Sequence, residues 1–204
     1  MYTLIGGANN RTFRVVWMLE ELGLPYQRQF AQPHDPLVSA HSPLGKLPVL
    51  LAEGEALTDS VAILTWLADS TGRMTARAGT LARAKQDGLT QQIVDEIEGP
   101  LWTSTRHSFV LPAEHRVPAV KDSLRWEFAR SCEVLAARMA GPFVMGEEIT
   151  VPDILLAHCL GWAQVAKFPL ETPALLAFAE RLRGRDAFRR AMASDRAIMA
   201  QCQE

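Results

Sequence analysis

Residues 2–30 read YTLIGGANNRTFRVVWMLEELGLPYQRQF, and this stretch predicts the architecture of the N-terminal part of the chain. The short β-prone run Tyr2–Ile5 is followed by two glycines, which is typical of a buried strand and its exit. Apolar residues then recur at helical spacing from about residue 11 to residue 22. A second strand is expected at residues 26–30. A strand, a helix and a strand in about 30 residues make one βαβ unit.

Residues at both ends of the expected helix support this interpretation. Asn9 and Asn10 are good N-cap residues, because their side chains accept hydrogen bonds from the free N–H groups of the first turn. Gly23 suits the position after the last helical residue, and Pro25 prevents the helix from continuing. The helix therefore has a start and a stop signal of its own.

The next part of the chain predicts a hairpin and a second helix. Two short strands, at residues 47–51 and 55–57, are separated by the tight-turn pair Glu53-Gly54. Thr58-Asp59-Ser60 then opens a helix that ends at Gly72. The proline-rich segment before the hairpin is expected to be irregular, with one short helical turn. This order of elements is that of a thioredoxin-like domain.

The remainder of the chain reads as helices, so the predicted fold class is α+β. A linker at residues 71–80 separates a thioredoxin-like domain at residues 1–74 from an all-α helical domain at residues 81–204. The first long helix is expected to be interrupted at Gly99-Pro100, since proline removes a helical hydrogen bond. The apolar stretch at residues 151–165 should be the buried helix of the second domain.

Composition excludes several classes of protein. Twenty-one basic residues against 23 acidic ones leave a net charge of −2, which argues against a nucleic-acid or membrane-surface binder. No stretch of 18 apolar residues is present, so no membrane span is expected. Three widely spaced cysteines without a CxxC pair suggest no disulfide framework and no metal site. Together with an N-terminus that lacks the pattern of a signal peptide, they indicate a reducing cytoplasm.

Four blocks of sequence, in order along nearly the whole chain, resemble the cytosolic glutathione S-transferases of bacterial type. They are residues 14–26, 42–50, 57–67 and 150–154. The resemblance implies a transferase that conjugates glutathione to a small electrophile, with glutathione as cosubstrate and no metal. It also implies a homodimer and a role in detoxification. Fold does not by itself establish activity, which must be argued from the site.

The resemblance assigns one set of residues to glutathione. In the family a cis proline, here Pro48, leaves the backbone of the preceding residue, here Leu47, free to pair with the cysteinyl part of the tripeptide. Ser60, at a helix N-terminus, would bind the γ-glutamyl carboxylate, and Asp59 would meet the ammonium group. Asp59 and Ser60 are also suited to cap that helix, and the two roles are compatible.

A basic residue would hold the other end of glutathione. Lys46 is the candidate partner of the glycyl carboxylate, and His34 and His41 in the same loop are alternatives. A solvated loop charge is the competing interpretation for each of them.

The thiol-activating position departs from the family pattern. The family places a Tyr, Ser or Cys between the first strand and the first helix, and the register brings Asn10 there. No cysteine occurs in residues 1–131, which argues against mixed-disulfide chemistry. The Asn10 amide can donate a hydrogen bond to a thiolate, with Asn9 and Thr12 as neighbours. The alternative is that Asn9 and Asn10 only cap the helix.

Further expectations concern the second domain. An electrophile site between the domains would be lined by Ala8 and by three residues of the first helix of the second domain, namely Trp102, Arg106 and His107. Thr150-Val151-Pro152-Asp153 reads as a capping box with a purely structural role. Cys132, Cys159 and Trp126 are expected in the core.

Two other functions remain open from sequence. A non-catalytic glutathione-binding or structural module would explain the asparagine at position 10. A glutathione-dependent peroxidase or isomerase would use the same cosubstrate. Affinity for glutathione, turnover of an aryl halide and a peroxide-coupled assay separate these possibilities.

Overall fold

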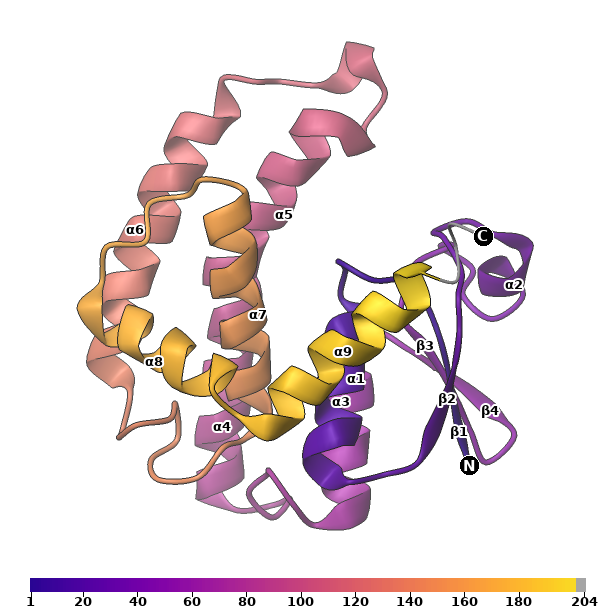
Figure 1. Cartoon of the computed structure of the whole chain (residues 1–204). Helices are drawn as coiled ribbons and strands as arrows, with labels where there is room; N and C mark the ends of the chain where they lie inside the picture. The colour runs from indigo at the N-terminus through magenta and orange to yellow at the C-terminus, as the bar shows by residue number, and fades with distance from the viewer. Residues whose placement is uncertain (201–204) are drawn as a thin grey trace. The chain divides into compact units, whose positions relative to one another are not determined.

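A computed structural model of the chain describes residues 1–200 (Figure 1). These residues form two compact units, one built from residues 1–75 together with residues 183–200, the other from residues 76–182. The first unit combines a mixed sheet with helices, and the second is built from helices. The predicted α+β fold class is confirmed.

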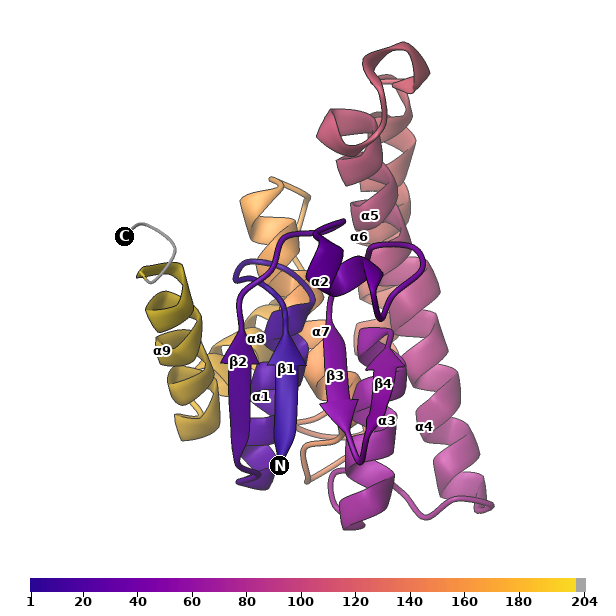
Figure 2. The same cartoon turned by 90° about the vertical axis from the view of Figure 1, so that its right-hand side faces the viewer.

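The sheet of the first unit has four strands in the order β2-β1-β3-β4 (Figure 2). Strands β1 (Tyr2–Ile5) and β2 (Tyr26–Gln29) are parallel. Strands β3 (Val49–Ala52) and β4 (Glu55–Thr58) form the antiparallel hairpin, and β3 also runs antiparallel to β1. The parallel pair requires the crossover helix that the sequence predicted between residues 11 and 22.

Helices α1 (Thr12–Leu22) and α3 (Ser60–Thr71) pack against each other and cover one face of the sheet (Figure 2). Helix α1 ends at Gly23, which adopts the left-handed conformation with φ 66° and hydrogen-bonds back to Leu19. This is the C-terminal signal read from the sequence. The expected short turn in the proline-rich segment is α2 (Pro36–Ser39).

The last helix, α9 (Asp186–Ala200), packs along α1 within the first unit. The Phe188 ring makes edge-on contacts with Phe13 at 5.4 Å and with Trp17 at 5.0 Å between ring centroids. The sequence predicted a second domain at residues 81–204, which includes α9, whereas the structure groups residues 183–200 with the first unit. The two differ because the side of α1 that carries Phe13 and Trp17 is apolar, and α9 packs over it.

Two arginines add ion pairs to this packing. Arg185 binds Glu21 through two short contacts of 2.6 and 2.7 Å, and Arg190 binds Glu20 at 2.7 Å. Both acidic residues lie at the C-terminal end of α1, so this end of the α1–α9 pair is held by charged groups.

The second unit begins with α4 (Leu81–Gln92), which continues through a π-helical segment, η1 (Ile93–Glu98), into α5 (Gly99–Thr105). The expected interruption at Gly99-Pro100 is therefore wrong. A π-helical turn is wider than an α-helical one, so the chain can accommodate the proline ring and its missing N–H without leaving the helix. A second π-helical segment, η2 (Arg106–Val110), ends this run.

A short 3₁₀ turn, η3 (Ala113–His115), leads to the remaining helices of the unit, α6 (Val120–Arg138), α7 (Val151–Val165) and α8 (Pro173–Arg183). Helix α7 is buried on nearly all sides, as expected. Within residues 1–200, none of the helices combines the length and apolar character that crossing a bilayer requires.

The capping box at the start of α7 is present. The Asp153 carboxylate is fully buried and accepts hydrogen bonds of 2.7 Å from the backbone N–H groups of Val144 and Thr150. The Thr150 hydroxyl donates a third bond of 2.7 Å. One side chain thus ties the preceding loop to the first turn of α7.

Cys132 and Cys159 are buried and unbridged, as expected of small apolar side chains, and Cys202 lies outside the described residues. Burial, reinforced by the Glu133 charge, raises the pKa of Cys132 to about 12. A thiol with this pKa carries almost no thiolate at neutral pH, so Cys132 has a packing role.

Candidate functional site

Three loops of the first unit meet at one edge of the sheet. Ile5 at the end of β1 pairs with Val49 at the start of β3, and Val49 pairs with Thr58 at the end of β4. These three residues form one row across the sheet. The residues that follow β1, precede β3 and follow β4 therefore gather beyond the same row.

The junction between β4 and α3 is formed by Asp59, whose backbone is left-handed with φ 69°. Its carboxylate oxygen Oδ1 accepts hydrogen bonds from the N–H groups of Val61 at 2.8 Å and Ala62 at 3.2 Å. Asp59 is thus the N-cap of α3. A non-glycine residue in this conformation is costly and is often found at functional sites.

Ser60, the next residue, is hydrogen-bonded to Arg14 of α1. The Arg14 guanidinium donates a 3.2 Å hydrogen bond to Ser60 Oγ, and Arg14 is only 1% exposed. An arginine side chain carries a permanent positive charge in proteins. The junction therefore combines a helix N-terminus, a hydroxyl and a fixed cation, which together suit an anion.

The sequence interpretation had not assigned Arg14 to the site. A signal was nevertheless present, because Arg14 stands within the apolar run formed by Phe13, Val15, Val16 and Trp17. An arginine on the buried side of a helix requires a polar partner. Which partner it finds depends on the packing of α1 against α3.

The loop before β3 contains the cis peptide bond Leu47–Pro48, as expected. Lys46 is exposed, and its backbone N–H donates to Ser42 Oγ at 3.2 Å. Gly45 precedes it with φ 61°, and a Cβ there would lie 2.2 Å from the His34 ring, so this position requires glycine.

Of the two histidines of this loop, His34 is joined to it by its backbone. The His34 N–H donates to the Gly45 carbonyl at 2.8 Å, so the two residues lie side by side. His41 is half-buried. The structure therefore places His34 beside the residue that precedes Lys46.

The loop between β1 and α1 contains Asn10, the candidate thiol-activating residue. Its Oδ1 accepts a 2.8 Å hydrogen bond from the Thr12 N–H, and its Nδ2 donates to the Ala8 carbonyl at 3.3 Å. Asn10 thus binds a free N–H at the start of α1, but the N-cap position is Arg11, so neither Asn9 nor Asn10 is the N-cap residue that the sequence predicted. An amide group carries two N–H hydrogens, and the contact with Ala8 uses one of them.

The neighbours of Asn10 point elsewhere. Asn9 is left-handed with φ 59°, its backbone N–H lies 3.4 Å from Asp195 Oδ2, and its side-chain nitrogen lies 3.4 Å from the Met199 sulfur. Thr12 is fully buried against Gly6, and its hydroxyl has no hydrogen-bond partner among residues 1–200. Of the three candidate residues, Asn10 is therefore the one whose side-chain amide makes its hydrogen bonds within the segment between Ala8 and Thr12.

Family models match most of the chain. The model of the glutathione S-transferase N-terminal domain matches residues 11–70, and that of the glutathione S-transferase C-terminal domain matches residues 100–186. The chain belongs to the glutathione S-transferase family. The N-terminal match includes Asn10's neighbour Arg11, the cis-proline loop and the β4–α3 junction.

Individual members of the family agree with this assignment. The chain is 41% identical over 63 residues to glutathione S-transferase 3 of Schizosaccharomyces pombe, and the match spans 26% of that relative's length. A glutathione transferase from Methylococcus capsulatus has a similar structure, with 25% identity, a TM-score of 0.82 and coverage of 97% of this chain and 100% of that one.

A fungal structure has the same fold. The glutathione transferase URE2P6 from Phanerochaete chrysosporium, solved in complex with oxidized glutathione, has 22% identity and a TM-score of 0.81 and covers 97% of both chains. At this level of identity the likeness concerns the fold.

The candidate electrophile-site residues of this chain lie on different units. Ala8 is in the first unit, whereas Trp102 is on α5 and Arg106 and His107 are on η2 of the second. The Arg106 guanidinium lies 6.0 Å from the Trp102 ring centroid, and His107 Nδ1 accepts a 3.0 Å hydrogen bond from the Val117 N–H. Their grouping with Ala8 stays a prediction.

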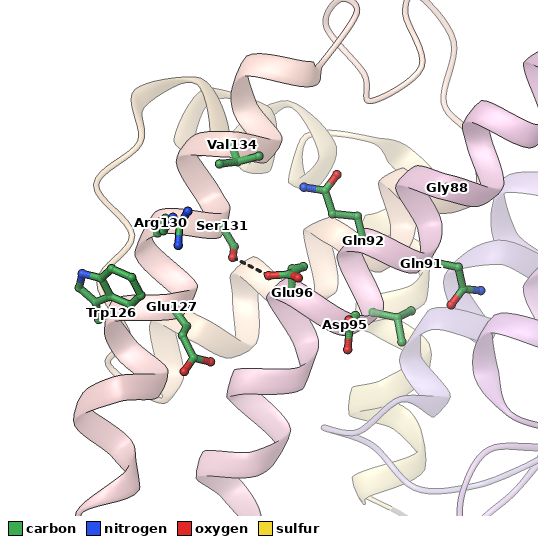
Figure 3. A pocket seen from close by; sticks show the side chains of 11 residues that line it. Gly88, Gln91, Gln92, Asp95, Glu96, Trp126, Glu127, Arg130, Ser131 and Val134 are labelled. Carbon is green, nitrogen blue, oxygen red and sulfur yellow. Dashed lines mark hydrogen bonds between the residues drawn. The ribbon is translucent and has the colours of Figure 1, made fainter.

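The second unit also contains a pocket of about 750 Å³ between the α4–η1 helix and α6 (Figure 3). The Ser131 hydroxyl donates to Glu96 at 3.1 Å across it. None of the residues that the sequence assigned to glutathione or the electrophile lines this pocket.

Trp126, expected in the core, lines this pocket and is 63% exposed. Its ring lies 5.5 Å from the Arg130 guanidinium, one turn further along α6. The spacing of apolar residues in α6 does not show which face of the helix is buried. In the structure Phe128 lies on the buried face and Trp126 on the exposed one.

Among residues 1–200, no three His, Cys, Asp or Glu side chains come close enough together to hold a metal ion.

Proposed function

We propose that this protein is a glutathione transferase that conjugates reduced glutathione to small electrophiles by stabilising the glutathione thiolate. The observation that carries the proposal is the Ile5–Val49–Thr58 row, which brings Asn10, the Leu47–Pro48 loop and Ser60 to one edge of the sheet. These are the positions that the family resemblance assigns to the sulfur, the cysteinyl backbone and the γ-glutamyl end.

Two charged ends of the tripeptide would be bound by separate groups. Ser60 Oγ, with Arg14 fixed behind it, would receive the γ-glutamyl carboxylate at the start of α3. The Asp59 carboxylate caps α3 and remains exposed, so it would also attract the ammonium group. Lys46 would pair with the glycyl carboxylate, and His34 and His41 are the alternatives in that loop.

The thiol must be held as a thiolate in order to react. An ordinary thiol has a pKa of about 8.5, and each unit by which that pKa is lowered requires about 1.4 kcal/mol of preference for the charged form. The Asn10 amide and the N-terminus of α1 would supply it. An amide cannot accept the thiol proton, which therefore passes to solvent. The thiolate then forms the new C–S bond as the electrophile releases its leaving group.

Two related structures support glutathione as the ligand. URE2P6 was solved with oxidized glutathione, and a family member from Pseudomonas fluorescens was solved with two glutathione molecules bound. Turnover of an aryl halide with glutathione tests conjugation. Retention on immobilised glutathione without turnover would favour the non-catalytic module, and consumption of peroxide would favour the peroxidase.

Replacing Ser60 by alanine is expected to weaken glutathione binding about tenfold, since a hydrogen bond to a charged group contributes roughly 1.5–3 kcal/mol. The dissociation constant is measured by calorimetry on variants whose thermal unfolding midpoint matches that of the wild type. Ser70→Ala is the matched control, because Ser70 lies on the same helix and its hydroxyl bonds to the Leu67 carbonyl. An unaltered dissociation constant in Ser60→Ala would contradict the γ-glutamyl assignment.

We also propose that the protein is a cytoplasmic homodimer, as the family resemblance implies. The exposed apolar side chains Trp126 and Val134, both at the pocket in Figure 3, are surface that association would cover. Light scattering after gel filtration is expected to give twice the chain mass of 22.6 kDa. A particle with the mass of one chain at micromolar concentration would contradict the dimer.

A further inference from the structure

A buried ion pair joins the C-terminal helix to the sheet. Arg28 on β2 and Asp195 on α9 are 2.7 Å apart, and their side chains are only 7% and 9% exposed. Burying two charges costs several kcal/mol, which the pair recovers only if further hydrogen bonds satisfy both groups. Arg28 Nε has no hydrogen-bond partner among residues 1–200, and the groups that bind the other polar atoms of the pair show what it is connected to.

Most of those partners belong to the loop between β1 and α1. Arg28 Nη2 donates to the Gly7 carbonyl at 3.2 Å, and Asp195 Oδ2 faces the Asn9 N–H at 3.4 Å. Arg28 Nη1 also contacts Ser194 Oγ at 3.3 Å. The ion pair thus holds the backbone on either side of Ala8, two residues before the candidate thiol-activating side chain.

A second contact reinforces this attachment. The Asn9 side-chain nitrogen lies 3.4 Å from the Met199 sulfur, one turn of α9 after Asp195. Asn9 itself has φ 59°, a left-handed conformation that asparagine adopts more readily than most non-glycine residues. Two successive turns of α9 therefore contact the residue next to Asn10.

The other end of α9 is attached differently. There Arg190 pairs with Glu20, and Arg185 pairs with Glu21, at the far end of α1 from the loop. The Arg190 side chain is 54% exposed. The Arg190–Glu20 pair joins the same two helices without contacting the loop. Removing it therefore tests the general effect of docking α9 separately from a specific effect on the loop.

We propose that Asp195, together with Arg28, is a positioning residue that fixes the β1–α1 loop so that the Asn10 amide faces the sulfur of bound glutathione. The inference rests on the proposed function. Its physical basis is that a hydrogen-bond donor stabilises a developing or resting anion only when it is held at the correct distance beforehand. A loop released at Gly7 and Asn9 would carry Asn10 with it.

Asp195→Asn tests the inference, because it keeps the shape of the side chain and removes the charge that binds Arg28. The readout is the ultraviolet absorbance of the thiolate in the binary complex with saturating glutathione, followed as a function of pH. We expect the pKa of the bound thiol to rise, leaving about a three- to tenfold smaller thiolate fraction at acidic pH. Amide hydrogen exchange at Asn9 is expected to become faster.

Two further variants complete the experiment. Arg190→Gln removes the exposed ion pair of the same helix and is expected to leave the thiol titration unchanged. The double variant Arg28→Gln/Asp195→Asn removes both buried charges, so it tests the loop even if a lone buried Arg28 prevents Asp195→Asn from folding. It should show the same loss of thiolate.

The possible failures can be told apart. If the thiol pKa is lowered in the wild-type complex and is lowered equally in folded Asp195→Asn or in the double variant, the positioning role is overturned. The proposed function then stays intact. An equal loss of thiolate in Arg190→Gln also overturns it, because the effect would then belong to the docking of α9 as a whole. A wild-type complex whose thiol titrates like free glutathione overturns the proposed function, and the inference with it.

Discussion

Replacing Asn10 by alanine is expected to lower kcat/KM for conjugation about ten- to hundredfold, with little change in the dissociation constant of glutathione. The magnitude is that of one hydrogen bond to a charged group, about 1.5–3 kcal/mol. Affinity should persist, because the proposed function assigns the γ-glutamyl end to Ser60 and the cysteinyl backbone to Leu47. Steady-state kinetics with an aryl halide and calorimetry with glutathione measure the two quantities.

Asn10→Asp separates activation from a structural role at the start of α1. Aspartate keeps an oxygen to accept the 2.8 Å bond from the Thr12 N–H, so this hydrogen bond is retained. It lacks the amide donor and adds a negative charge beside the sulfur. We therefore expect the stability of the wild type with an activity at least as low as that of Asn10→Ala. Wild-type turnover in Asn10→Asp would remove Asn10 from the mechanism and leave it with the structural hydrogen bond to Thr12.

Replacing Asp153 by alanine is expected to lower the free energy of unfolding by about 2–5 kcal/mol, because each buried donor left without an acceptor costs roughly 1–3 kcal/mol. The affected donors are the backbone N–H groups of Val144 and Thr150. Urea denaturation followed by circular dichroism measures the change. Glu148→Ala, an exposed carboxylate in the same loop, is the control and should stay within about 0.5 kcal/mol of the wild type.

Asp153 also predicts a pH dependence of stability. Burial raises its pKa from the ordinary value of 3.8 to about 6, against the effect of its three hydrogen bonds. The folded protein then binds this proton more tightly than the unfolded chain, so protonation of Asp153 stabilises the fold. Its contribution is fully present below about pH 4 and is lost as the pH rises towards about 6, by up to about 3 kcal/mol.

The comparison with Asp153→Asn isolates this effect, since asparagine does not titrate. The difference in unfolding free energy between wild type and Asp153→Asn should fall between about pH 4 and pH 6 and stay constant above that range. A difference that stays constant over this interval and instead falls as the pH drops below about 4 would mean that the hydrogen bonds outweigh burial and lower the pKa of the carboxyl.

The elements of the fold that the sequence predicted correctly depend on local interactions. Tyr2–Ile5 and the hairpin at Glu53-Gly54 are specified by residues within a few positions of each other. The same holds for the C-terminal end of α1 at Gly23 and for the capping box of Asp153. Gly99-Pro100 was misread because proline is a local signal for a break, whereas packing of the surrounding helix allowed a π-helical turn.

The candidate site divides in the same way. Asp59 and Pro48 could be named from sequence because each lies in a short block typical of the family. Asp59, Pro48 and Asn10 come to the same end of the sheet because β1 pairs with β3 and β3 pairs with β4. That pairing follows from the order of the strands in one small domain. Trp126 could not be placed, because both faces of α6 carry large side chains and only the packed unit shows which one is buried.

Sequence alone was sufficient for the family, the α+β class and the residues at the loop tips, because these are written in short contiguous patterns. Only the tertiary structure revealed the groups that support the site. Arg14 meets Ser60 across 46 positions, and Asp195 meets Arg28 across 167 positions and Asn9 across 186. Neither helical nor strand periodicity in the sequence predicts such long-range contacts. They exist because α1 packs against α3 and because α9 returns to cover α1, and each buried charge then binds the partner that this packing brings within reach.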